Sequence, residues 1–179
     1  MVWLHRFILV LKSTTMSKKN KIAVYLTAAC LLLLGVSFYP WFTTINLRTE
    51  KFSCGFREDI FTLQWIHSVE REIWRETYKA EDDHLLLFRS QFKTFGAGTP
   101  YSVHLTTKEG FVESDPNLEM PQIYWMISRN VESTIMTAQG SIPIYQYFDD
   151  YSEITLSTQK NTIWTFLKDT CYDKFTASN

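Results

Sequence analysis

The chain lacks the short motifs that mark common catalytic and ligand-binding sites. It has no CxxC pair and no His-rich tract, so no spaced set of zinc ligands is present. Neither GxxxxGK[ST] nor GxGxxG occurs, and the stretch Gly96-Ala97-Gly98 opens no predicted helix, which excludes the usual phosphate-binding loops. There is no Ser/His/Asp order or nucleophile elbow, and Ser68 forms no dyad with His67 because adjacent strand residues face apart.

Glycine and proline are scarce, and neither an internal repeat nor a low-complexity tract occurs. Hydrophobic residues make up 45% and aromatic residues 16% of the chain, which is enough to fill a core. Collagen-like and disordered compositions are therefore excluded. The 179 residues have room for one domain plus an accessory segment.

Acidic residues are absent before residue 43, and no charged residue lies between Ile22 and Leu47. The apolar run in this stretch matches the roughly 20 residues that cross a bilayer as a helix. Basic residues precede it, which predicts a cytoplasmic N-terminus and an external C-terminal domain. We therefore predict a cytoplasmic segment at 1–20, a transmembrane helix at 21–42 and an extracytoplasmic β domain at 43–179. The predicted location is the bacterial cytoplasmic (inner) membrane, crossed once, with the domain in the periplasm or on the extracellular side.

A cleaved signal peptide is the alternative to this anchor. Its cleavage site would follow the apolar run, where Gly35-Val36-Ser37 comes nearest to a small-x-small pattern and bulky residues come next. A lipoprotein signal at Cys30 fits poorly, because leucines continue the apolar run past the cysteine. We favour the uncleaved anchor. Residues 1–15 have an apolar stretch too short to span a membrane, and we interpret them as disordered or as an artefact of start-codon choice.

The remainder of the chain is acidic, with 13 basic and 19 acidic side chains and a net charge of about −6. This balance argues against binding of nucleic acid or anionic lipid through a basic patch. Only three cysteines are present, and Cys30 lies in the apolar run. Cys54 and Cys171 either form a disulfide, which export permits, or remain two small buried thiols.

Alternation of apolar and polar residues predicts strands in this remainder. The first runs from Phe61 to His67, the second passes through Trp74, Glu76 and Tyr78, and the third runs from Leu85 to Phe92. A polar turn at Glu81-Asp82-Asp83 separates the last two. Further strands are predicted at Tyr101–Thr106, Ile123–Ser128, Ser133–Ala138, Ile142–Tyr147 and Glu153–Ser157.

Many short strands with turn signals between them predict an all-β fold, either an antiparallel sandwich or a partly open barrel. The tail differs, because Ile163, Leu167, Cys171 and Phe175 recur every four residues. This spacing predicts one apolar stripe on a short C-terminal helix. Asn161 or Thr162 is a suitable cap for its start.

His67 and Glu70 form the sharpest polar pair, at the point where the first strand ends. In a straight strand, positions three apart face opposite sides, so the pair meets only if the chain bends. With a bend, Glu76 could join them as a ligand for a divalent metal, or the group could act in acid–base catalysis. We favour a structural corner or a recognition surface over both. The glycines at 96 and 98 predict a sharp turn or a close backbone contact with a partner.

Three features stand close together between Phe61 and Tyr101: the HSVE run, the Glu76-x-Tyr78 step and the GAG-x-P turn. In this combination the chain resembles domain-of-unknown-function family eighteen-fifty, more faintly again from Ile123 to Ser157. The resemblance implies a small extracytoplasmic domain with a hydrophobic N-terminus, encoded near components of TAXI-type TRAP transporters. It marks eight positions of a binding or structural motif with no assigned role: His67, Ser68, Glu70, Glu76, Tyr78, Gly96, Gly98 and Pro100.

Two functional hypotheses follow. The first is a non-enzymatic accessory protein, without a cofactor, that docks on a membrane transporter or its solute-binding protein. The second is an exported metal-dependent enzyme or a small-ligand sensor that uses His67, Glu70 and Glu76. We favour the first, because three such groups without a sequence-near cluster are a thin basis for a metal site.

Overall fold

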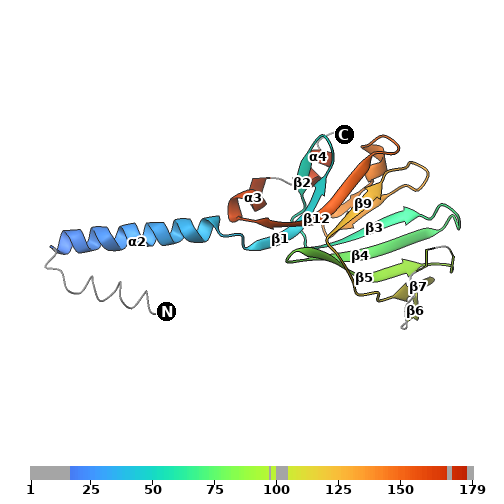
Figure 1. Cartoon of the computed structure of the whole chain (residues 1–179), viewed down its shortest axis with the longest axis horizontal. Helices are drawn as coiled ribbons and strands as arrows, with labels where there is room; N and C mark the ends of the chain where they lie inside the picture. Colours follow the sequence, from blue (N-terminus) through green and yellow to red (C-terminus); the bar gives the residue numbers. More distant parts are fainter. Residues whose placement is uncertain (1–16, 97, 100–104, 169–170, 177–179) are drawn as a thin grey trace. The chain divides into compact units, whose positions relative to one another are not determined.

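The computed structural model describes residues 17–96, 98–99, 105–168 and 171–176. The chain divides after Tyr39 into an N-terminal helical unit and a β domain (Figure 1). Residues 1–15, for which disorder or a start-site artefact was predicted, lie outside the described part.

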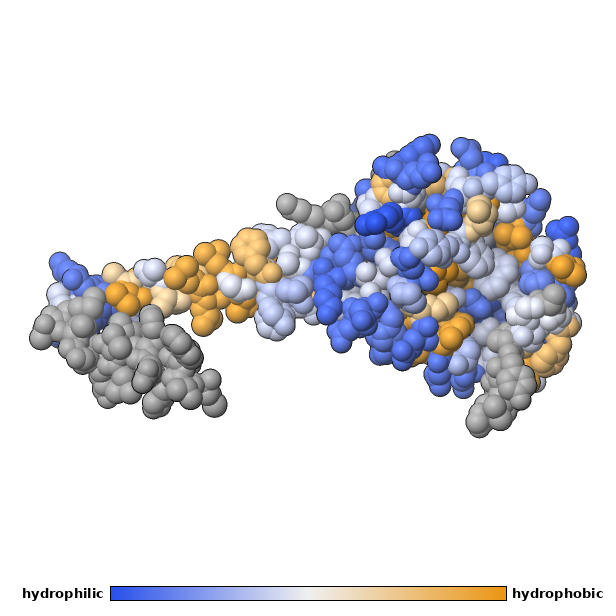
Figure 2. Space-filling view, viewed as in Figure 1, coloured by the Kyte–Doolittle hydropathy of each residue, from blue (hydrophilic) through white to orange (hydrophobic). Residues whose placement is uncertain are grey.

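Helix α2 (Lys18–Phe38) contains 21 residues, none of them buried. At 1.5 Å per residue it is about 30 Å long, the thickness of a bilayer's hydrocarbon core. Its last residue is Phe38, and Tyr39 is the C-cap. Tyr39 has an extended backbone, which is the conformation favoured before a proline, here Pro40. Apolar side chains cover much of its length (Figure 2). By length and composition α2 can cross a membrane, a property that signal sequences share.

The β domain consists of two antiparallel sheets, which confirms the predicted sandwich (Figure 1). The smaller sheet has the strand order β2-β1-β12-β9, and the larger has the order β11-β10-β3-β4-β5-β7-β6, with β8 paired to β5. The strands are β1 (Phe42–Arg48), β2 (Ser53–Gly55), β3 (Ile60–Ile66), β4 (Ile73–Glu81), β5 (His84–Phe92), β6 (Leu105–Lys108), β7 (Phe111–Ser114), β8 (Leu118–Met120), β9 (Gln122–Met126), β10 (Thr134–Thr137), β11 (Gly140–Ile142) and β12 (Glu153–Asn161).

One hydrophobic core lies between the sheets. Strands β1 and β12 pair over seven residues, from Phe42 opposite Asn161 to Arg48 opposite Thr155. Because side chains alternate along a strand, this ladder turns one row of apolar residues toward the larger sheet. The row and its main counterparts in the larger sheet are all fully or almost fully buried: Ile45, Leu47, Ile154, Leu156, Phe61, Leu63, Tyr78, Leu85 and Ile135.

Most of the predicted strands are present. Strands β3, β4, β5, β9, β10 and β12 each overlap a predicted one, and the polar turn after Glu81 joins β4 to β5. Of the predicted strand Tyr101–Thr106, residues 101–104 lie outside the described part, and Leu105 begins β6. Strands β1, β2, β7 and β8 were not predicted.

The predicted strand Ile142–Tyr147 is wrong. Strand β11 ends at Ile142, and a 3₁₀ helix, η1 (Ile144–Gln146), follows. Pro143 lies between them and has no backbone N–H to donate to a ladder, so it ends the strand. Its carbonyl instead accepts a hydrogen bond from the N–H of Gln146 at 3.0 Å, which closes the helical turn.

The C-terminal tail contains two short helices, α3 (Ile163–Lys168) and α4 (Cys171–Thr176), and residues 169–170 lie outside the described part. Thr162 caps α3 as predicted, because its Oγ1 accepts a hydrogen bond from the N–H of Thr165 at 3.3 Å. The predicted single apolar stripe is wrong. Cys171 and Phe175 on α4 are buried, whereas Ile163 and Leu167 on α3 are exposed.

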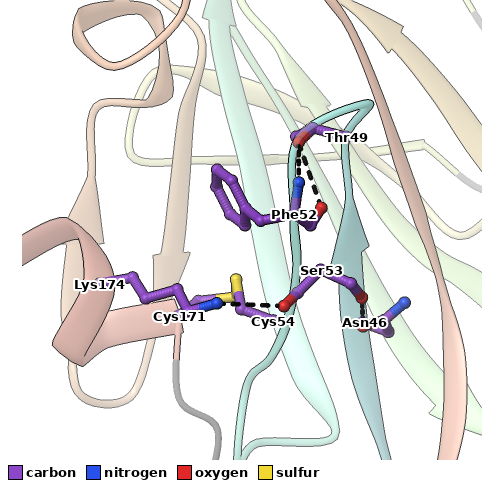
Figure 3. The surroundings of a disulfide bond; sticks show 7 residues. All are labelled: Asn46, Thr49, Phe52, Ser53, Cys54, Cys171 and Lys174. Carbon is purple, nitrogen blue, oxygen red and sulfur yellow. Dashed lines mark hydrogen bonds between the residues drawn. A yellow bond between two sulfur atoms is a disulfide. The ribbon is translucent and has the colours of Figure 1, made fainter.

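A disulfide joins Cys54 on β2 to Cys171 on α4 (Figure 3). The bond settles the open alternative for this pair in favour of a cross-link. Around it, the Nζ of Lys174 donates a hydrogen bond to the carbonyl oxygen of Ser53 at 3.3 Å and lies 5.1 Å from the ring centre of Phe52. Phe175 adds contacts with three aromatic rings, Phe52, Tyr147 and Phe148.

We predict that replacing Cys54 and Cys171 together by serine lowers the free energy of unfolding by about 2–5 kcal/mol. The reason is that the bond closes a loop spanning 117 residues and so restricts the unfolded chain strongly. Urea titration of the full chain in detergent, with and without a reductant, measures the loss. Cys30→Ser is the matched control and should have no effect. The reductant should lower the free energy of unfolding of the native chain but not that of the double variant. An equal loss in both proteins would contradict the prediction.

Candidate functional site

The chain bends sharply between β3 and β4, at the HSVE run. The N–H of His67 donates a hydrogen bond to the carbonyl of Glu72 at 2.8 Å, and the N–H of Arg71 donates to the carbonyl of His67 at 2.9 Å. Arg71 adopts a left-handed backbone, with φ of 58°, which reverses the chain direction. The bend that a His67–Glu70 contact requires is therefore present.

This bend brings the side chains of His67 and Glu70 together. The Nδ1 of the imidazole contacts the Oε2 of the carboxylate, and each side chain is only 15% exposed. One face of the imidazole stacks on the indole of Trp74, with the ring centres 4.5 Å apart. Trp74 in turn packs on Phe92. The imidazole of His67 is thus contacted from two directions, by the carboxylate of Glu70 in the turn and by the indole of Trp74 on β4.

Gly96 completes this arrangement from a different part of the chain. A Cβ atom at this position would overlap the carboxylate of Glu70, so only glycine fits without a shift. Thr99 closes the turn that carries the glycine: its Oγ1 accepts a hydrogen bond from the N–H of Gly96 at 2.8 Å, and its own N–H donates to the Gly96 carbonyl at 3.2 Å. The HSVE run and the GAG turn are therefore in contact.

We call this cluster, made of residues 67–70 and residues 95–96, the motif corner. The side chains of His67 and Glu70 are turned toward each other and largely shielded, and two apolar side chains are exposed. Val69 is 71% exposed and Phe95 is 64% exposed, and each is the chain neighbour of a residue in the Glu70–Gly96 contact. Ser68 lies in the turn and is exposed. Gly98 has a φ of 82°, as a sharp glycine turn requires, and Pro100 lies outside the described part.

Glu76 and Tyr78 form a separate pair farther along β4. The phenol of Tyr78 donates a hydrogen bond to the Oε2 of Glu76, and its ring stacks on Phe61. Burial raises the pKa of Glu76, and the hydrogen bond from Tyr78 opposes that change in part. The pKa of Tyr78 is raised by burial first and by the adjacent carboxylate second. In both groups burial thus shifts the pKa in the direction that stabilises the neutral form.

The sheet register places two buried serines beside Glu76. Ser90 on β5 is its direct partner, and Ser114 on β7 is the partner of Ser90, so all three side chains share one face. Both serines are fully or almost fully buried, and neither Oγ has a hydrogen-bond partner among the described residues. Sequence analysis missed this polar row, because serine within an alternating strand usually indicates the solvent face.

The proposed metal ligands do not form one group. Among the residues that the structure describes, no set of three or more His, Cys, Asp or Glu side chains is placed to hold a metal ion. His67 and Glu70 lie in the motif corner, whereas Glu76 is paired with Tyr78.

A separate small pocket lies on the outer face of the smaller sheet, next to α3. Hydroxyl and amide side chains line it, and the described lining carries no charge. Some of these groups are bonded to each other: the Nδ2 of Asn161 donates to the Oγ1 of Thr44, and the Oγ of Ser53 donates to the Oδ1 of Asn46, both at 2.7 Å. No residue of the predicted motif lines this pocket.

Residues 61–144 match a family model described as Domain of unknown function (DUF1850). The family expected from the HSVE, Glu-x-Tyr and GAG motifs is therefore confirmed for this part of the chain. The match runs from β3 to the start of η1, and it leaves out α2, β1, β2, β12 and the C-terminal helices. No curated protein and no solved structure matches the chain.

The contact between Gly96 and Glu70 leads to a prediction by double-mutant cycle. Gly96→Ala should destabilise the domain by about 1–3 kcal/mol, because the new methyl group overlaps the carboxylate. In a Glu70→Ala background the same change should cost much less, since the overlapping atoms are gone. Urea unfolding of the four proteins gives the coupling energy. Gly35→Ala, at a helical position with open space around it, is the control for the method. Equal costs in both backgrounds would refute the contact.

The raised pKa of Glu76 leads to a prediction about pH. An acid whose pKa is higher in the folded state binds its proton more tightly there, so this contribution to stability is lost as pH rises from about 4.5 through the raised value. Glu76→Gln keeps an acceptor for Tyr78 but cannot ionise. The stability of the variant minus that of the native chain should therefore grow with pH across this window, by at most about 1.4 kcal/mol per pH unit. A difference independent of pH, measured by urea unfolding, would contradict this assignment.

Proposed function

We propose that the protein is a membrane-anchored, extracytoplasmic, non-enzymatic accessory protein whose motif corner binds a component of a membrane transporter. The observation that supports binding most is the convergence of His67, Glu70 and Gly96, three motif positions from two distant segments, in one cluster. The chain neighbours of Glu70 and Gly96, Val69 and Phe95, are exposed beside that cluster. Aromatic side chains such as Phe95 are enriched at protein interfaces.

Support for the anchor comes from the N-terminal unit and from the cysteines. Helix α2 is apolar and has the length to span a bilayer, and Lys18, Lys19 and Lys21 lie at its start. Basic residues at this end favour a cytoplasmic N-terminus. The disulfide in the β domain suits an oxidising compartment, which also argues for export. We therefore place the domain on the outer side of the bacterial cytoplasmic membrane, in the periplasm or extracellular space.

The described polar groups of the motif are paired with one another, and this supports binding over catalysis in our proposal. The imidazole and the carboxylate of the motif corner contact each other, and the phenol of Tyr78 donates to Glu76. The second candidate, a metal-dependent enzyme or a small-ligand sensor that uses His67, Glu70 and Glu76, would need these groups to converge on a ligand. For a sensor, the neutral pocket beside α3 offers a better-formed site than these three residues do.

The test uses the full chain in its native membranes. An alkaline phosphatase reporter fused after Asn179 should be active only if the domain lies outside the cytoplasm, and the chain should resist extraction by carbonate. From membranes solubilised in mild detergent, the native chain should co-purify with a transporter subunit or its solute-binding protein. The variants Val69→Asp and Phe95→Asp should lose at least about tenfold of that partner, because a charge in an apolar interface is costly.

Leu118→Asp is the matched control, because Leu118 is also exposed and apolar but belongs to β8, outside the motif corner. It should leave capture unchanged, and thermal unfolding should show that all three variants fold. His67→Ala should behave differently and lose stability by about 1–3 kcal/mol. Capture that is insensitive to both corner variants would refute the proposed surface. Stoichiometric zinc or manganese that is lost in His67→Ala would favour the metal-dependent alternative.

A further inference from the structure

Four of the six residues of helix α3 are apolar, yet only Phe166 among them is shown packing a ring on the β sheet. The ring of Phe166 stacks on Phe42, with centres 4.7 Å apart. The other apolar side chains are exposed: Ile163 at 37%, Trp164 at 52% and Leu167 at 60%. The apolar stripe of an amphipathic helix is normally covered by an apolar environment. The exposed fractions of Ile163, Trp164 and Leu167 leave room for such an environment beside α3.

The residue on which α3 packs indicates what environment its exposed apolar side chains meet. Phe42, on which Phe166 stacks, is also the first residue of β1, and it follows the last residue of α2, Phe38, by four residues. An extended chain covers at most about 3.6 Å per residue, so Phe42 lies within about 15 Å of the end of α2. This limit follows from the covalent chain alone, whatever the orientation of the helix.

The short connection itself has the composition of a membrane interface. Tyr39 and Trp41 are both exposed, and Phe42 is partly exposed. Tyrosine and tryptophan prefer the zone between headgroups and hydrocarbon, where an amphipathic ring has both environments. Trp164 on α3 adds a third ring of this kind. No acidic residue occurs in α3, so no carboxylate of this helix opposes its approach to lipid headgroups.

We infer that α3 docks on the membrane that α2 crosses, with Ile163, Trp164 and Leu167 inserted at the lipid interface. This inference rests on the proposed anchoring by α2. We take the occupant of the apolar surface to be lipid and not a protein, because α3 packs on Phe42, which the covalent chain keeps within about 15 Å of the end of α2. Amphipathic segments of this kind lie about 5–10 Å into the boundary between headgroups and acyl chains. The docked helix would hold the β domain in a fixed orientation on the membrane.

The experiment places an environment-sensitive dye on α3 in the full chain. Cys30→Ser removes the free cysteine, and the disulfide protects the other two, so a new cysteine is the single labelling site. Leu167→Cys carries the dye on α3, and Tyr151→Cys carries it on an exposed control position. The nine-residue strand β12 separates Tyr151 from α3, a distance of about 30 Å along the strand. Both proteins are reconstituted in nanodiscs of phosphatidylcholine and phosphatidylglycerol.

The expected result is a blue-shifted emission at position 167 that lipids with a nitroxide near the headgroup quench, and a water-like, unquenched emission at position 151. Ile163→Cys should repeat the result for position 167, which guards against an effect of one substitution. Circular dichroism checks that each labelled protein is folded.

Three outcomes would overturn the inference. Co-migration of the protein with nanodiscs together with water-like emission at 163 and 167 would refute docking of α3 and leave the anchor intact. A blue shift without quenching by lipid, accompanied by cross-linking through position 167, would show that a second copy covers the surface. Failure of the native chain to associate with nanodiscs would refute the anchor and the docking together.

Discussion

The antiparallel ladder between β1 and β12 is the interaction on which most of the domain depends. It joins the first strand of the β domain to the last one, more than 100 residues later in the sequence. One face of the ladder carries the apolar row that closes the core, with Ile45 and Leu156 fully buried. On the other face, Asn161 donates a hydrogen bond to Thr44 at 2.7 Å. Because β2 pairs with β1 and carries Cys54, the ladder also sets the position of the disulfide and of α4.

The family match covers only part of this folding unit. Residues 61–144 include every strand of the larger sheet but, of the smaller sheet, only β9. Without β1 and β12, the core face of Leu63 and Ile135 would be open to water, at a cost of roughly 25 cal/mol per Å² of apolar surface. The flanking segments are therefore part of the folding unit, although the family model does not cover them. The motif residues, in contrast, all belong to the larger sheet and its loops.

The fold was predictable where local pattern and final environment agree. Strands β3, β4 and β5 are buried on one face, so their sequences alternate, and alternation located them. Strand β1 was missed because all of it except Arg48 lies in the uncharged stretch that begins in α2, so charge alone shows no boundary there. The tail was misread for a related reason. The apolar side chains of the tail do recur every four residues. However, Cys171 and Phe175 on α4 are buried, whereas Ile163 and Leu167 on α3 are exposed, and the spacing alone does not predict this difference.

The candidate site was predictable in part. The HSVE and GAG segments were singled out by resemblance, but their contact depends on the turn after His67 and on the missing Cβ of Gly96. Those are properties of three-dimensional packing and leave no periodic signal. Among the described residues, His67, Glu70 and Glu76 do not form a group that could hold a metal ion. The aromatic ring of Trp74 contacts the imidazole of His67, while Glu76 is paired with Tyr78.

The distribution of polar and apolar groups at the motif corner is the strongest argument about its role. A catalytic site directs its titratable groups toward the substrate and leaves at least one of them accessible. Here the histidine and the glutamate are turned toward each other and are largely shielded, while Val69 and Phe95 are turned toward solvent. An exposed apolar side chain on a flexible loop would lose conformational entropy on binding, which weakens association. Under the proposed function, the contacts of His67 with Glu70 and of Glu70 with Gly96 would lower that cost, because they restrict the chain on which Val69 and Phe95 lie.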